Sequence, residues 1–284
     1  GVLNVINAAV SDVSPALTED PRIKAITFTG STRTGRLLAE GAARGLKRIT
    51  LEMGGKGPLV VLRDADLDAA VRAATFGAVL HQGQVCMAGS RVIVDSALHD
   101  EFCTRFVERA KQVRVGPPDQ EDTVVGPLIR LSQCGFIAGQ IEDAVSKGAV
   151  VRCGGTHDGP YFAPTVLSGV TPAMRIYHEE SFGPVVSVLR AQDTQDALRL
   201  ANDTAYGLSA AVMTENLRDA WYFAQNIEAG MVHVNDSTIS DEPHVPFGGV
   251  KNSGFGREGG RYSIEEMTEL KWVTFQTGKA SFPF

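Results

Sequence analysis

The feature that most constrains the fold is a regular alternation of short apolar runs with longer segments of helical periodicity. The apolar runs predict buried strands at residues 25–28, 49–51, 59–62, 92–94, 185–189 and 232–234, and a further strand is expected at 150–152. The periodic segments predict helices at residues 35–43, 67–80, 98–113, 131–147, 196–202 and 217–227. Apolar strands that alternate with amphipathic helices predict a largely parallel sheet covered on both faces, which places the chain in the α/β class.

The beginning of the chain is unusual for such a fold. We expect it to open directly on a short strand, with no leading helix, as if a doubly wound sheet were entered partway. The first six residues, Gly-Val-Leu-Asn-Val-Ile, contain neither a positively charged region nor a long apolar run. They do not predict a signal peptide.

Composition limits the kinds of partner that we expect the chain to bind and the cellular compartment in which we expect it. A net charge of −6 without a basic stripe argues against nucleic-acid binding. The chain has no run of about 18 apolar residues, so we expect no membrane span. Four cysteines without a Cys-x-x-Cys pair, and six histidines that occur singly, predict neither a disulfide framework nor a metal site. Cysteine usage of this kind favours a reducing, cytoplasmic location.

One cysteine differs from the other three in its surroundings. Cys86 lies in a loop of glycines, glutamines and small residues, between an apolar helix and the strand at 92–94. A cysteine is most often buried and inert, and the loop alone leaves both a structural and a functional reading open. Cys103 and Cys134 fall on apolar stripes of predicted helices, and Cys153 ends a predicted strand, so these three fit the structural reading.

A glutamate stands in a comparable setting. Glu52 comes at the end of the strand at 49–51, separated by Met53 alone from Gly54 and Gly55. A thiol and a carboxylate, each at the end of an element, suggest a nucleophile and a general base.

Three further motifs are ambiguous alone. The segment from Gly30 to Gly35 has the glycine spacing of a P-loop, but it continues with Arg-Leu instead of Lys-Ser/Thr, so we read it as a strand-to-helix turn. Residues 254–259 match Gly-x-Gly-x-x-Gly, yet they do not lie between a strand and a helix of a βαβ unit, which indicates a glycine-rich loop. Glu179 and Glu180 fit either a solvated turn or a ribose-binding carboxylate.

The order of these motifs is more specific than any one of them. The sequence contains, in this order, Phe-Thr-Gly-Ser-Thr at 28–32, Leu-Glu-Met-Gly-Gly-Lys at 51–56, Gly-Gln-Val-Cys at 83–86, Glu-Ser-Phe-Gly-Pro-Val at 180–185 and Pro-Phe-Gly-Gly-Val-Lys-x-Ser-Gly at 246–254. In these motifs the chain resembles the second half of an aldehyde dehydrogenase subunit.

The resemblance implies a division of the chain. Residues 1–54 would be the remnant of a Rossmann-like NAD(P)-binding domain. Residues 55–254 would form a parallel-sheet α/β catalytic domain, and residues 255–284 a return segment with an oligomerisation strand. That strand corresponds to the alternating segment at 269–275, whose Trp272 needs a partner, so the resemblance implies a homodimer or homotetramer.

The resemblance also implies a reaction. Cys86 would attack an aldehyde to form a thiohemiacetal, hydride would pass to NAD+ or NADP+, and Glu52 would activate the water that hydrolyses the resulting thioester. The Cys86 backbone N–H would form part of the oxyanion hole. Glu258 would correspond to a second glutamate that relays protons, and Asn235 would brace the active-site loop.

Four residues would bind the cofactor: Gly30 and Ser31 the pyrophosphate, Glu180 the nicotinamide ribose, and Phe182 the region of the nicotinamide. The stretches at 81–87 and 233–244 are similar to the benzaldehyde, vanillin and salicylaldehyde dehydrogenase branch, which implies an aromatic aldehyde substrate. NAD+ is the first expectation for the cofactor, with NADP+ open.

Two alternatives stay open at this point. The chain could be a catalytically incomplete, aldehyde dehydrogenase-like fragment with a structural or binding role, since the family's oxyanion-hole asparagine and adenosine-ribose lysine would lie upstream of Gly1. It could also belong to the coenzyme A-acylating branch, although that branch generally lacks a base equivalent to Glu52.

Overall fold

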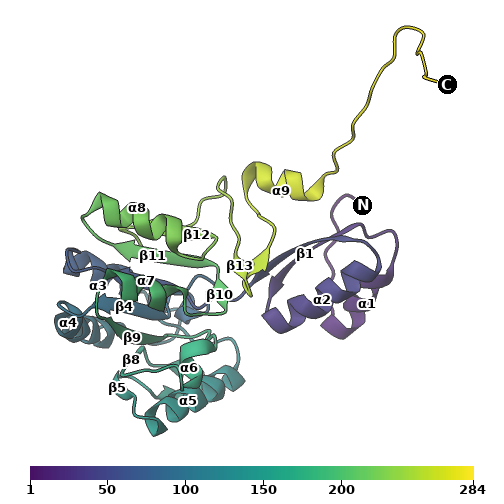
Figure 1. Cartoon of the computed structure of the whole chain (residues 1–284). Coiled ribbons are helices and arrows are strands. Elements are labelled where there is room, and N and C mark those ends of the chain that lie inside the picture. The colour runs from purple at the N-terminus through teal and green to yellow at the C-terminus, as the bar shows by residue number, and fades with distance from the viewer.

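A computed structural model describes all residues, 1–284, and divides them into two lobes joined by a few strands (Figure 1). The smaller lobe contains a three-stranded sheet in the order β1 (Ala25–Gly30), β2 (Arg48–Met53), β14 (Gly254–Phe255). Strands β1 and β2 are parallel, and β14 returns antiparallel to β2. Helices α1 (Val10–Glu19) and α2 (Thr32–Arg44) pack beside this sheet.

The larger lobe is built on a seven-stranded sheet in the order β12-β11-β3-β4-β9-β8-β5. Its strands are β3 (Pro58–Val61), β4 (Arg91–Asp95), β5 (Val150–Cys153), β8 (Thr165–Ser168), β9 (Val185–Ala191), β11 (Ser209–Met213) and β12 (Met231–Val234). Every neighbouring pair is parallel except β5 with β8. The predicted α/β class with a largely parallel sheet is confirmed.

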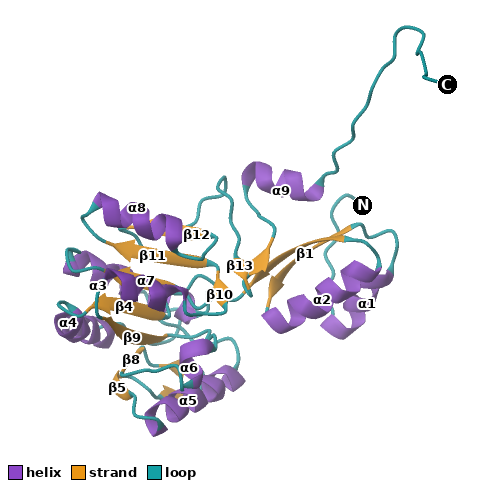
Figure 2. Cartoon of the chain, in the orientation of Figure 1, coloured by secondary structure: helices purple, strands orange, loops and turns teal.

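Both faces of this sheet are covered by helices, as Figure 2 shows. The helices of this lobe are α3 (Leu67–Val79), α4 (His99–Lys111), α5 (Leu131–Ser146), α6 (Arg175–His178), α7 (Thr194–Asn202) and α8 (Leu217–Asn226). Short elements complete the chain: a 3-10 turn (Leu80–Gly83), β6 (His157–Asp158), β7 (Tyr161–Phe162), β10 (Tyr206–Gly207), β13 (Val250–Lys251) and α9 (Gly260–Met267).

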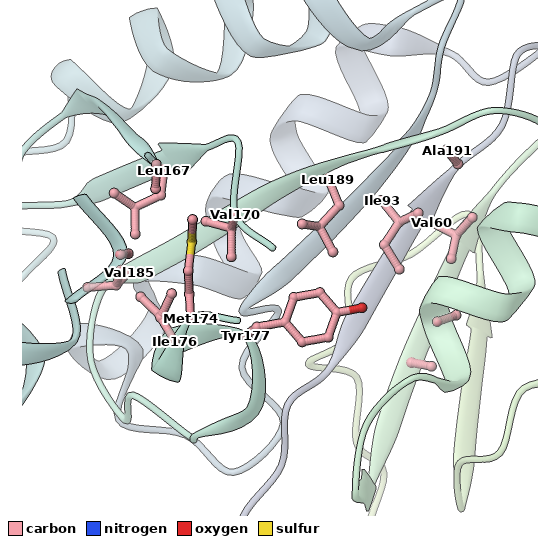
Figure 3. Packing of buried hydrophobic residues seen from close by; sticks show 14 of the residues in the cluster. Val60, Ile93, Leu167, Val170, Met174, Ile176, Tyr177, Val185, Leu189 and Ala191 are labelled. Carbon is pink, nitrogen blue, oxygen red and sulfur yellow. The ribbon is translucent and has the colours of Figure 1, made fainter. Parts of the chain in front are cut away.

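The core follows from the two-residue period of the strands. Leu59 and Val61 of β3 point to one face and pack with α3 and α4, while Val60 points to the other face and packs with α5, α7 and α8. Figure 3 shows part of the second cluster, in which the ring of Tyr177 lies among aliphatic side chains such as Leu189. A strand buried on both faces must be apolar throughout, which explains the continuous apolar runs of the sequence.

Local signals set two of the helix starts. The Asp66 carboxylate, directly before the periodic segment at 67–80, accepts the N–H of Ala69 at 3.0 Å and caps α3. The Ser31 hydroxyl accepts the N–H of Thr34 at 3.3 Å and caps α2 directly after β1. The segment from Gly30 onward is therefore a strand-to-helix turn, as expected.

The expectation that the chain opens on a strand is wrong, because α1 precedes β1. This helix contains Pro15, which removes a backbone donor from its interior and obscures the helical pattern in the sequence. Strands β8 and β11 and the short helices α6 and α9 were also not predicted, since short segments have little periodicity to read.

The strand expected at 269–275 is not formed either. Residues 268–284 have no regular structure and extend away from both lobes (Figure 1), and Trp272 is 91% exposed. A strand requires backbone partners, and a single chain supplies none for this segment. The structure contains no helix that is both long and apolar enough to cross a membrane.

Candidate active site

The motif residues meet where the chain passes from the small sheet into the large one. In the parallel register of β1 and β2, Thr29 is paired with Glu52 and Gly30 with Met53, so Gly30 and Glu52 share the carboxyl end of that sheet. Cys86 precedes β4 and Glu180 precedes β9, and these two strands are neighbours in the large sheet. Gly30 and Glu52 thus lie at the carboxyl end of the small sheet, the end at which open α/β sheets bind ligands, whereas Cys86 and Glu180 lie at the amino ends of β4 and β9.

Two glycines allow the loops to approach one another. The N–H of Gly55 donates to Glu180 Oε1 at 3.0 Å. A β-carbon at Gly55 would lie 2.5 Å from the Cys86 carbonyl oxygen, and one at Gly54 would overlap the Glu180 carboxylate. Only residues without a side chain fit at both positions, so the glycine pair after Glu52 joins the thiol loop to the Glu180 turn.

The loop that carries Cys86 begins with a strained turn. His81, Gln82 and Gly83 have φ values of 47°, 59° and 68°, in the left-handed region that non-glycine residues rarely adopt. Gly83 packs against the backbone of Gly183, and a β-carbon there would overlap it. Backbone strain at consecutive residues is typical of functional loops.

The Cys86 thiol is partly exposed, and its pKa is raised to about 11. Burial is the main cause, the carboxylates of Glu180 and Glu52 add to it, and the backbone N–H groups of Met87 and Cys86 oppose it. The thiol is therefore protonated at neutral pH in this state, and its nucleophilic attack requires a group that takes the proton. Cys103 and Cys134 are buried, as their positions on apolar stripes predict.

Glu52 is 3% exposed, and neither of its carboxylate oxygens has a hydrogen-bond partner. Its pKa is raised to about 8, mainly by burial and next by the charge of Glu258, while Arg257 opposes the shift. A buried carboxylate without partners is costly, and it is uncommon in a position that serves structure alone. A pKa near 8 is well matched to taking a proton from water near neutral pH.

Glu258 lies near the Glu52 carboxylate, and separate contacts hold it in place. The Thr27 hydroxyl of β1 donates to Glu258 Oε1 at 2.6 Å, and Glu258 also pairs through its backbone with Phe247. The chain returns from the large lobe at this point to place a second carboxylate near Glu52. The glycine-rich segment at 254–259 belongs to this return, and it forms the antiparallel β14 and the loop before α9 instead of part of a βαβ unit.

The four residues expected to contact a cofactor offer groups that suit a dinucleotide. Gly30 and Ser31 are exposed at the N-terminus of α2, where the first backbone N–H groups of the helix have no helical partner. Glu180 accepts one hydrogen bond, from the Gly55 N–H to Oε1, which leaves Oε2 available to a hydroxyl donor. Phe182 is 38% exposed, with a φ of 47°, in the same turn.

Asn235 does not brace the loop of Cys86, contrary to expectation. Its side chain clamps Thr214 at the end of β11, with Oδ1 accepting the Thr214 N–H and Nδ2 donating to the Thr214 carbonyl, both at 2.9 Å. The parallel register of β11 and β12 brings these two residues together, which the sequence order does not reveal.

Two buried basic residues near the site were not singled out from the sequence. Lys56 follows the glycine pair and is 2% exposed, and Arg91 at the start of β4 is fully buried. A charged residue between a glycine turn and an apolar strand was the available signal for Lys56. Arg91 gave none, because its backbone-carbonyl partners lie far along the chain.

With this geometry in place, the chain can be compared with known proteins. The family model described as aldehyde dehydrogenase family matches residues 1–273. The chain belongs to the aldehyde dehydrogenase family.

Individual aldehyde dehydrogenases agree with the family match. A vanillin dehydrogenase from Pseudomonas fluorescens is 46% identical over 286 residues, an alignment that covers all of this chain and 59% of that protein. The chain thus spans less than two thirds of the length of this relative.

Solved aldehyde dehydrogenase structures share the fold. A salicylaldehyde dehydrogenase from Pseudomonas putida G7, determined with salicylaldehyde, superposes with a TM-score of 0.94 at 45% identity over 96% of this chain and 57% of that one. An NAD-dependent aldehyde dehydrogenase from Sinorhizobium meliloti gives a TM-score of 0.96 at 39% identity, covering 99% of this chain and 56% of that one.

Proposed function

We propose that the protein containing this chain oxidises an aldehyde, of aromatic type, to the carboxylic acid with NAD+ or NADP+. The observation that carries the proposal is the buried, unpartnered carboxylate of Glu52, whose charge reaches the Cys86 thiol. A carboxylate free of hydrogen bonds, whose charge acts on the thiol, is available to a water molecule or to the thiol proton.

Cys86 supplies the nucleophile. Its sulfur forms a bond to the aldehyde carbon as the thiol loses its proton, and the carbonyl becomes the alkoxide of a thiohemiacetal. The Cys86 backbone N–H stabilises that oxyanion. The alkoxide re-forms a carbonyl as hydride leaves the former aldehyde carbon, which gives the thioester. Glu52 then takes a proton from water, which attacks the thioester, releases the acid and returns the thiol.

The cofactor, when bound, accepts the hydride. Residues of this chain that would hold it are Gly30 and Ser31 at the N-terminus of α2, for the pyrophosphate, and Glu180, for a hydroxyl of the nicotinamide ribose. The free Oε2 of Glu180 and the helix N-terminus support these assignments. Phe182 would pack near the nicotinamide, and Glu258 would pass the proton from Glu52 toward solvent.

The substrate class rests on the relatives. The vanillin and salicylaldehyde dehydrogenases similar to this chain are named for aromatic aldehydes. We therefore propose that benzaldehyde-type substrates have a higher kcat/KM than short aliphatic aldehydes, with NAD+ as the preferred cofactor. A comparison of benzaldehyde with propanal, each with NAD+ and with NADP+, tests both statements.

Self-association is also proposed. The segment at 269–275 alternates in sequence, yet it has no strand partner within the chain, and Leu270, Trp272 and Phe275 are almost fully exposed. Joining a sheet of a second copy would satisfy its backbone and cover these side chains. Light scattering after size exclusion would show a dimer or tetramer, and a monomer at micromolar concentration would refute the proposal.

Trapping of the thioester tests the mechanism in the protein expressed from its full natural coding sequence. Glu52→Gln should give a burst of one NADH per site followed by turnover slowed about 100-fold or more, because deacylation loses its base. Intact mass should then show an acyl adduct, and Cys86→Ala should abolish it. A Glu52→Gln variant with wild-type turnover and no adduct would contradict the roles of both residues.

A further inference from the structure

Lys56 is a buried ammonium group for which the proposed reaction has no use. It is 2% exposed, although it directly follows the glycine pair that contacts Cys86 and Glu180. Its one side-chain hydrogen bond is a long one, from Nζ to Ser181 Oγ at 3.5 Å. Burying an ammonium group costs free energy unless an opposite charge or hydrogen bonds compensate it, so its partner must lie near this turn.

The backbone of Lys56 is fixed by a second buried cation. Arg91 Nε donates to the Lys56 carbonyl at 3.1 Å, and the same guanidinium donates to the carbonyls of Leu200 and Ala201, both at 2.9 Å, at the end of α7. The partners of Arg91 are therefore backbone carbonyls, and Arg91 brings no negatively charged group to Lys56. It also repels the Lys56 ammonium.

The opposite charge comes from the glutamates before β9. Burial and Arg91 lower the pKa of Lys56 to about 7, while Glu180 and Glu179 raise it. Glu179 is engaged elsewhere, because it pairs with Arg175 and accepts from Gln140. Burial raises the pKa of Glu180, and the Gly55 N–H and Lys56 lower it. Lys56 and Glu180 thus stabilise each other's charged form in a buried site.

We propose that Lys56 is a positioning residue for cofactor binding, whose buried ammonium at Ser181 provides the counter-charge that orients Glu180 toward the nicotinamide ribose. The inference deepens the proposed function and rests on it, because it takes the ribose contact of Glu180 as given. Lys56 itself touches neither substrate nor cofactor in this assignment.

The turn has other anchors, so removing the Lys56 charge should not dismantle it. Gln133 Nε2 donates to the Ser181 carbonyl at 2.6 Å, and Gly183 packs against Gly83. Replacing a buried charge by an apolar side chain of similar volume is often tolerated by the fold. Lys56→Met should therefore give a folded protein in which Glu180 lacks its counter-charge.

The experiment measures the equilibrium dissociation constant of NAD+ by calorimetry in the protein expressed from its full coding sequence. We expect Lys56→Met to raise this constant about tenfold. Ser181→Ala removes the hydrogen bond but keeps the ammonium, and it should raise the constant less than Lys56→Met does. Hydrolysis of p-nitrophenyl acetate, which needs Cys86 but no cofactor, should change by less than about twofold in Lys56→Met.

A double-mutant cycle with Glu180→Gln decides between a direct and an independent effect. If Lys56 acts through Glu180, Lys56→Met should weaken binding by less than about twofold in the Glu180→Gln background. An equal loss in both backgrounds, or no loss in the single variant, would overturn the inference. Should Lys56→Met fail to melt cooperatively, the same dissociation constants are measured for Lys56→Gln, alone and with Glu180→Gln, and judged by the same criteria.

The two proposals fail differently. If Glu180→Gln leaves NAD+ binding unchanged, the ribose contact is wrong, and with it the cofactor assignment on which the inference rests. If Glu180→Gln weakens binding while Lys56→Met does not, the ribose contact stands and only the role of Lys56 is refuted.

Discussion

The Cys86 carbonyl lies against Gly55, so close that a β-carbon at residue 55 would be 2.5 Å from its oxygen. The same glycine donates its N–H to Glu180 at 3.0 Å. One residue without a side chain therefore sets the distance between the nucleophile's loop and the carboxylate proposed to bind the cofactor.

Gly55→Ala should disrupt this arrangement. The methyl group must displace a backbone carbonyl, which cannot rotate away as a side chain would, so the thiol loop must shift. We expect kcat to fall about 100-fold, as a displacement of about 1 Å can cause, with the thermal midpoint lowered as well. Steady-state kinetics and a thermal melt check both effects.

Gly135→Ala is the matched control. Gly135 lies inside α5 with nothing within 4 Å of a β-carbon. Alanine in an open helical position should stabilise the protein by about 0.5–1 kcal/mol and leave kcat unchanged. Equal losses of activity in both variants would mean that the contact of Gly55 with Cys86 is unimportant.

The raised pKa of Cys86, about 11, predicts slow alkylation in the absence of cofactor. Because the thiolate is the reactive form, the rate with iodoacetamide should rise about tenfold per pH unit between pH 7 and 9 without levelling off. Mass spectrometry that resolves Cys86 from the other cysteines measures this rate. A plateau near pH 7 would show that the thiol ionises more readily than its burial suggests.

Glu52 should make the fold less stable as the pH rises. Its pKa is about 8 in the folded chain against 4.5 ordinarily, so between these values the native state holds a proton that the unfolded state has lost. Stability from this residue is fully present below pH 4.5 and is lost as the pH rises to 8. Glu52→Gln should remove that loss, which is on the order of a few kcal/mol.

Thermal melts of wild type and Glu52→Gln at pH 5 and pH 9 measure the effect. The thermal midpoint of the variant, relative to that of wild type, should be higher at pH 9 than at pH 5. A difference between the two proteins that is the same at both pH values would mean that Glu52 titrates normally.

Glu258 should control the pH at which Glu52 becomes a base. Its carboxylate is the second cause of the raised pKa of Glu52, after burial. Glu258→Gln should therefore move the pH dependence of thioester hydrolysis to lower pH by up to about one unit. Single-turnover deacylation of the benzoyl enzyme between pH 6 and 9 measures this shift.

Thr27→Val tests the anchor of Glu258 without removing its charge. It deletes the hydroxyl that donates to Glu258 Oε1 at 2.6 Å and preserves the volume of the side chain. We expect a smaller shift than for Glu258→Gln, since the backbone pairing of Glu258 with Phe247 remains. An unshifted profile in Glu258→Gln would exclude electrostatic coupling between the two glutamates.

The sequence by itself determined the α/β class, because strands buried on both faces must be apolar, and this shows directly in runs such as 59–62. It also determined local features, such as the cap at Asp66 and the turn after Gly30, which depend on residues a few positions apart. Cys86 and Glu52 were found as candidates because polar, reactive side chains interrupted these patterns.

The tertiary structure alone decided what surrounds those candidates. The bond between Gly55 and Glu180 and the contact of Lys56 with Ser181 each join residues 125 positions apart. The unpartnered state of Glu52 and the return of Glu258 to Thr27 likewise depend on how two sheets meet. Periodicity and propensity act over a few residues, whereas burial and charge depend on neighbours in space, so pKa values and close glycine contacts emerge only from the folded chain.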